Sequence, residues 1–121
     1  MVKKSQLALI LDIVKGLKKE FPPEWALEEM EQESLEVSLD DVIVKLVKKK
    51  IIKRNFADER TFTAAFAAMF GDNDPLVKLA KKLQLSTSEY TDEFSPFAAE
   101  SSLNELISSL EEALNAAPEE A

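Results

Sequence analysis

The acidic residues are the first candidates for chemistry, because paired carboxylates can transfer protons or hold metal ions. Four glutamates crowd into one short segment: Glu28, Glu29, Glu31 and Glu33. A di-iron bundle would combine such glutamates with histidines in Glu-x-x-His pairs, and the chain has no histidine. Carboxylate acid–base catalysis would need one of these groups to be buried, whereas the segment is strongly polar. We therefore interpret the cluster as a solvated helix face.

The missing residue types exclude further classes of site. Without histidine and cysteine, the chain cannot build a catalytic triad with histidine, a thiol nucleophile, a thiolate zinc site or an iron–sulfur cluster. Two glycines are too few for a glycine-rich phosphate loop. The sequence predicts no enzyme, no metal site and no cofactor.

The segment "GDNDP", residues 71–75, superficially resembles the opening of a calcium-binding loop. An EF-hand would need an oxygen ligand at position 76 and a bidentate glutamate at position 83. Leucine stands at both positions. The end of one helix and the start of the next explain this segment: Gly71 ends one helix, Asp74 caps the next, and Pro75 is its first residue.

Residues 45–54 carry six cations and no acid, although the chain has a net charge of −8. The candidate phosphate contacts are Lys45, Lys48, Lys49, Lys50, Lys53 and Arg54. Neutralising phosphates needs several such cations, but base recognition prefers Arg, Asn or Gln, and only Arg54 and Asn55 qualify. Eight acids in residues 21–41 precede the segment. Three interpretations stay open: a solvated or internally paired face, a nucleic-acid contact and a membrane-surface contact.

The elements that position these residues are predicted to be helices. Glycine and proline are scarce, and apolar residues recur at three- and four-residue spacing. The sequence therefore predicts an all-α fold, a compact bundle of five to six short helices. The expected segments are 3–20, 23–35, 39–54, one capped by Asn55 or Asp58 and ending at Gly71, one from Pro75 to about 85, and 102–116.

The third of these segments has uncertain ends. Ser38 resembles an N-cap with acids in the first turn, and β-branched residues make a strand the alternative. Lys50 and Arg54 would fall on the same arc as the apolar stripe. Either this helix ends before Arg54, or both side chains reach a partner.

The chain length fits one domain. We divide it into a helical core (1–85), a polar linker or loop (86–101), a C-terminal amphipathic helix (102–116) and an acidic tail (117–121). The linker is rich in hydroxyls and is a candidate for modification. The apolar runs are too short to span a bilayer. The N-terminal segment is interpreted as a helix, not a cleaved signal, so a cytoplasmic location is expected.

Two apolar stripes could serve either as core or as a partner face. They are Phe62, Phe66 and Phe70, and Leu103, Leu106 and Leu110. The first functional hypothesis is a non-enzymatic protein–protein interaction or assembly module, a small acidic subunit or adaptor whose partner is another protein or a second copy. The alternative is a nucleic-acid-associated helical protein that contacts phosphates through residues 45–54.

Overall fold

A computed structural model describes residues 3–19, 32–52, 61–87 and 95–118. This part of the chain consists of five α-helices and contains no strand. The helices are α1 (Lys4–Lys18), α3 (Gln32–Lys48), α4 (Phe62–Phe70), α5 (Pro75–Thr87) and α6 (Pro96–Ala116). The predicted all-α bundle is confirmed.

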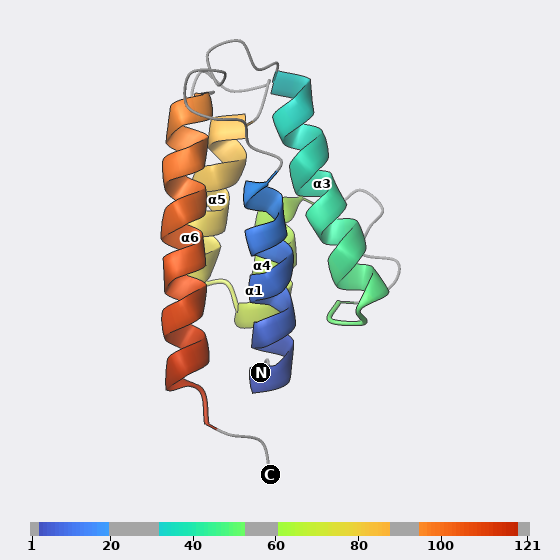
Figure 1. Ribbon diagram of the computed structural model, residues 1–121, viewed down its shortest axis with the longest axis vertical. Helices are drawn as coiled ribbons and strands as arrows, with labels where there is room; N and C mark the ends of the chain where they lie inside the picture. Colours follow the sequence, from blue (N-terminus) through green and yellow to red (C-terminus); the bar gives the residue numbers. More distant parts are fainter. Residues whose placement is uncertain (1–2, 20–31, 53–60, 88–94, 119–121) are drawn as a thin grey trace.

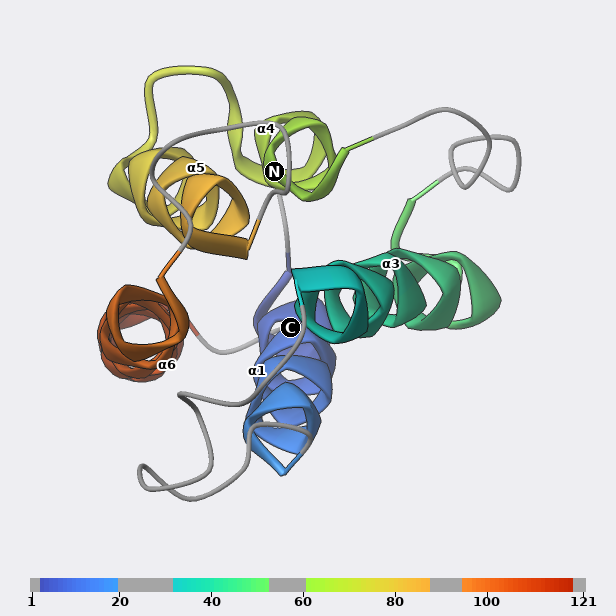
Figure 2. The same cartoon turned by 90° about the horizontal axis from the view of Figure 1, so that it is seen from above.

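The five helices form a closed ring (Figures 1 and 2). In ring order α1 packs on α3, α3 on α4, α4 on α5, α5 on α6, and α6 back on α1. As Figure 1 shows, α1 and α5 run upward and α3, α4 and α6 run downward, so most neighbours are antiparallel. The ring has an upper and a lower end, and each end collects residues that are distant in the sequence.

The core fills the centre of this ring with apolar side chains from all five helices. The largest that are almost completely buried are Phe66, Ile10, Leu17, Leu46, Leu83, Leu103, Leu106, Leu110, Val14 and Val42. Burying one such side chain contributes about 1.5–3 kcal/mol. The stripes predicted from helical spacing therefore face one common core.

Helix α3 begins earlier than predicted. Residues 32–37 and 38–48 form one continuous helix, so the prediction of a helix capped by Ser38 is wrong. No glycine or proline occurs between residues 32 and 48, and nothing there interrupts the backbone hydrogen bonds. The rest of the predicted 23–35 helix lies outside the described residues.

Helix α3 also ends earlier than predicted, at Lys48 instead of Arg54. Lys50 adopts a left-handed conformation with φ = 60°. Its N–H donates to the Val47 carbonyl at 2.9 Å, and the Ile51 N–H donates to the Leu46 carbonyl at 3.0 Å. This pair of bonds is the Schellman arrangement that ends helices.

The apolar pattern explains why the helix must stop there. If α3 continued, its 100° step would turn Lys50 toward the core and Ile52 toward water. In the structure Lys50 is exposed and Ile52 is buried. The left-handed conformation of Lys50 thus keeps its cation in solvent and allows Ile52 to be buried instead. Lys53 and Arg54 lie outside the described residues.

Replacing Lys50 with glycine is expected to raise the stability of the protein. The left-handed conformation costs a non-glycine residue about 1–2 kcal/mol, and the extra unfolded-state freedom of glycine offsets about 0.5–1 kcal/mol of that gain. In urea unfolding, the free energy of unfolding of Lys50→Gly should therefore be about 0.5–1 kcal/mol higher than that of Lys50→Ala, which removes the same charge. At the helical position Lys45 the same comparison should reverse, with glycine less stable than alanine. If the difference in stability between the glycine and alanine variants had the same sign at both positions, the left-handed conformation of Lys50 would be ruled out.

Helix α4 is capped by Thr61, whose side-chain oxygen accepts the Ala64 N–H at 3.1 Å. The cap was expected at Asn55 or Asp58, which lie outside the described residues. A second contact comes from α5, because the Gln84 side-chain oxygen accepts the Thr63 N–H at 2.9 Å. Gln84 thus satisfies an amide of the first turn of α4 that has no acceptor within its own helix.

The turn between α4 and α5 confirms the predicted end of one helix at Gly71 and the predicted start of the next at Asp74 and Pro75. Gly71 ends α4 with φ = 96°, and its N–H donates to the Ala67 carbonyl at 2.8 Å. A side chain at this φ would be strained. The Asp74 carboxylate caps α5 by accepting the Leu76 N–H at 2.9 Å.

Helix α6 begins six residues before the predicted start at Ser102. Ser95 is its N-cap, and the Ser95 hydroxyl accepts the Ala98 N–H at 3.2 Å. Ser102 lies inside the helix and is buried. The predicted 86–101 loop is thereby corrected at both ends, because α5 continues to Thr87 and residues 96–101 are helical. The physical reason is that Ala98, Ala99 and Glu100 are strong helix formers, which favours a helix over the predicted polar linker.

Candidate partner-binding groove

In Figure 1, α1 and α5 begin and α4 and α6 end at the lower end of the bundle. Residues of these helix ends line a groove of about 580 Å³. We call it the basal groove. Its lining residues are Leu7, Met69, Phe70, Asp74, Pro75, Leu76, Ser109, Glu112, Ala113, Ala116, Ala117 and Pro118. The volume falls within the range of about 300–1,000 Å³ that is ordinary for ligand pockets.

Small side chains at the end of α6 create the hollow. Leu106 and Leu110 fill the core, but the next position of the same stripe is Ala113, and Ala116 follows one turn later. A methyl group fills much less space than an isobutyl group, so the lower end is left open. The sequence signal for this hollow is the change from leucine to alanine along the stripe.

The apolar wall is formed by residues at the edge of the core. Leu7, Met69 and Leu76 are 6–7% exposed, whereas the central core residues are at zero. Phe70 is partly exposed. The groove is therefore a place where core side chains can be reached from solvent.

Among the described lining residues two are ionisable, Asp74 at the N-cap of α5 and Glu112 on α6. Glu112 is exposed and Asp74 is partly exposed. The amino ends of α1 and α5 and the carboxyl ends of α4 and α6 lie beside the groove, so their partial charges largely offset one another. The negative charge of the described lining comes mainly from the two carboxylates.

The predicted aromatic face proves to be mostly interior. Phe62 and Phe66 are buried, and their ring centroids lie 4.9 Å apart. The Phe66 and Phe70 centroids are 5.8 Å apart. Phe70 alone of these three rings lines the basal groove. The predicted leucine face is buried as well, at Leu103, Leu106 and Leu110.

Four of the six candidate phosphate contacts are exposed at the carboxyl end of α3. This α3 lysine cluster consists of Lys45, Lys48, Lys49 and Lys50. Cations are favoured at this helix end by the dipole, whereas anions are favoured at the opposite end. The dipole therefore explains much of the cluster without a bound phosphate.

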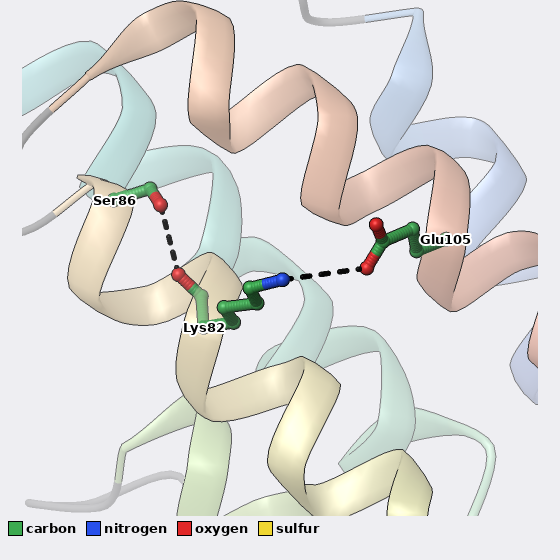
Figure 3. A network of polar contacts seen from close by, with 3 residues as sticks. All are labelled: Lys82, Ser86 and Glu105. Atoms are coloured by element: carbon green, nitrogen blue, oxygen red, sulfur yellow. Dashed lines mark hydrogen bonds and ion pairs between the residues drawn. The ribbon is translucent and has the colours of Figure 1, made fainter.

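The second group of lysines belongs to another side of the bundle. Lys78, Lys81 and Lys82 are exposed on α5. Figure 3 shows Lys82 reaching Glu105 of α6 at 3.7 Å, while the Ser86 hydroxyl donates to the Lys82 carbonyl. Helix α3 lies across the ring from α6 (Figure 2). The Lys82 ammonium is therefore directed away from the α3 lysine cluster.

In the described part of the chain, no group of three acidic side chains could hold a metal ion, and Asp74 is used as a helix cap. Glu28, Glu29 and Glu31 lie outside the described residues, and the side chain of Glu33 is not described. Among the helices described, none is both long and apolar enough to cross a membrane.

Comparisons with known proteins add no functional information. No protein family, curated protein or solved structure matches this chain. The functional argument therefore depends on two surfaces, the basal groove and the α3 lysine cluster.

Proposed function

We propose that the chain is a non-enzymatic protein–protein interaction module, a small acidic subunit or adaptor. It binds an apolar segment of another protein in the basal groove. The observation that carries this proposal is the groove itself, whose described lining is mostly apolar and includes Leu7, Met69 and Leu76 at the edge of the core. Elsewhere in the described part of the chain, the exposed large apolar side chains are Leu9, Val44 and Phe97, on three different helices. Single exposed apolar residues of this kind are ordinary.

The non-enzymatic part of the proposal is supported by the residue types. The sequence lacks histidine and cysteine, and Asp74, one of the two groove carboxylates, already caps α5. An open apolar groove with few polar groups is typical of recognition of an amphipathic helix.

The test is to titrate the isotope-labelled protein with an uncharged amphipathic peptide. The peptide carries leucines at i, i+3, i+4 and i+7 spacing on a background of glutamine and serine. Amide resonances of Met69, Phe70 and Ala113 should shift. Ala116→Trp should block the groove and abolish these shifts, because Ala116 is exposed at the groove wall.

The matched control is Ala98→Trp, at an exposed position near the opposite end of α6. This variant should bind the peptide like the unmodified protein. The proposal fails if millimolar peptide leaves the groove resonances unshifted, or if Ala116→Trp binds as well as Ala98→Trp.

The α3 lysine cluster favours a second candidate function, contact with nucleic-acid phosphates. Four exposed lysines lie within two turns, and none forms an ion pair with another described residue. Such binding should be weak, independent of sequence and sensitive to salt. Lys48→Glu combined with Lys49→Glu should remove the gel shift of a short duplex at low salt, whereas Lys78→Glu with Lys81→Glu should retain it. No shift with the unmodified protein would end this candidate.

A further inference from the structure

We infer that the segment bound in the basal groove is basic and combines apolar side chains with lysine or arginine. This inference rests on the proposed function and specifies the chemistry of the partner. The described lining of the groove combines apolar side chains with two carboxylates from different parts of the chain, Asp74 just before α5 and Glu112 on α6. A ligand that carries both apolar and cationic side chains matches that lining.

Asp74 can cap α5 and contact a partner cation at the same time. One oxygen, Oδ1, accepts the Leu76 N–H at 2.9 Å. An ionised carboxylate has about four acceptor sites on its two oxygens, so the other oxygen can accept from a lysine or arginine. A cation there would also reduce the cost of placing a carboxylate beside apolar side chains.

Among the described residues, no cation forms an ion pair with either of these two carboxylates. The ion pairs among the described residues join Lys15 to Glu111 at 3.5 Å and Lys82 to Glu105 at 3.7 Å. Glu111 is thus directed to α1, and the adjacent Glu112 is left to the groove. Lys3 and Lys4 precede Leu7 at the same end of α1, but neither lines the groove.

The charge of the whole chain acts in the same direction. A net charge of −8 attracts cationic segments and repels anionic ones over a distance of about one Debye length. Complementary charge mainly accelerates association and selects among partners. The apolar contacts would provide the affinity, and the carboxylates would select the basic partner.

The experiment compares three peptides that share the leucine register of the uncharged probe and differ only at their flanks. The flanks carry lysine, glutamine or glutamate. Fluorescence anisotropy at low salt should rank the affinities as lysine above glutamine above glutamate. Two exposed ion pairs should give roughly three- to tenfold tighter binding of the lysine peptide than of the glutamine peptide. Added salt should reduce that preference.

A double variant, Asp74→Asn with Glu112→Gln, tests whether these carboxylates cause the preference. Asparagine is as good an N-cap as aspartate, so the fold should be retained, which thermal unfolding would verify. The variant should lose most of the preference for the lysine peptide, with the affinity for the glutamine peptide unchanged. The net charge of the rest of the chain leaves a small preference, which added salt removes. The control Glu105→Gln, whose carboxylate contacts Lys82 instead of the groove, should keep the full preference.

The outcomes separate this inference from the proposed function. If no peptide binds, both are wrong. If all three peptides bind the unmodified protein equally, the groove is a docking site but the basic partner is refuted. If the double variant keeps the full preference for lysine, the cations bind elsewhere, and the inference is overturned although the proposed function stands.

Discussion

Phe66→Ala is expected to lower the free energy of unfolding by about 3–5 kcal/mol. The Phe66 side chain has no exposed surface, and its ring lies between those of Phe62 and Phe70 on α4. Helix α4 packs against both α3 and α5, so a cavity there would loosen two contacts of the ring of helices. Close-packed neighbours relax only partially around such a cavity.

Urea unfolding followed by circular dichroism would measure this loss. A domain of this kind is stabilised by about 5–15 kcal/mol, so the alanine variant can lose a large part of its folded population. Phe66→Leu keeps most of the volume and should cost less than about 1.5 kcal/mol. Leu9→Ala, at a side chain that is 38% exposed, should stay within about 0.5 kcal/mol of the unmodified protein. A Phe66→Ala variant as stable as Leu9→Ala would place Phe66 outside the core.

The helices and turns that were predicted correctly are those for which the sequence signals come from a few neighbouring residues and agree with one another. The residues Leu7, Ile10, Leu11, Val14 and Leu17 recur with helical spacing and are all buried. Gly71 and Asp74 act through their own backbone and side-chain chemistry, and both were predicted. Such features depend on a few neighbouring residues, which the sequence displays directly.

The errors occur where a local signal competes with packing. Serine is a residue type favoured at N-caps, but Ser38 lies within α3, and the helix continues on both sides of it. The end of α3 was visible in principle. On a continued helix Lys50 would lie on the apolar arc and Ile52 opposite it, and one left-handed residue resolves that conflict.

The basal groove could not be predicted, because the start of α1, the turn between α4 and α5, and the end of α6 build it, and these three segments are distant in the sequence. Leu7 and Ala116 lie near opposite ends of the chain, and only the ring arrangement brings them to one hollow. Sequence periodicity shows which face of a helix is apolar, but it does not show where the ends of neighbouring helices meet. The exposed α3 lysine cluster, by contrast, follows directly from residue type.

Leu106→Ala is expected to lower the free energy of unfolding by about 2–5 kcal/mol. The reason is that α6 is part of the core and not a tethered arm. Leu106 has no exposed surface, and α6 packs against both α5 and α1. The Ser95 N–H also donates to the Ser86 carbonyl at 2.9 Å, which ties the start of α6 to α5.

Hydrogen exchange separates the two descriptions of α6. In an integral helix the amides of Leu103 to Leu110 exchange with the same free energy as those of α1, and Leu106→Ala lowers both together. In a detachable arm only the α6 amides would become less protected, and the main unfolding transition would not move. Ser108→Ala, at an exposed position of the same helix, should change neither.

The same variant connects stability with binding. Helix α6 supplies Ala113 and Glu112 to the basal groove, so a peptide bound there stabilises the folded chain by mass action. Saturating lysine-flanked peptide should therefore raise the unfolding midpoint of Leu106→Ala by an amount set by its dissociation constant. Ala116→Trp combined with Leu106→Ala should lose that rise, since the groove is filled. A rise that persists in this double variant would place the peptide on another surface.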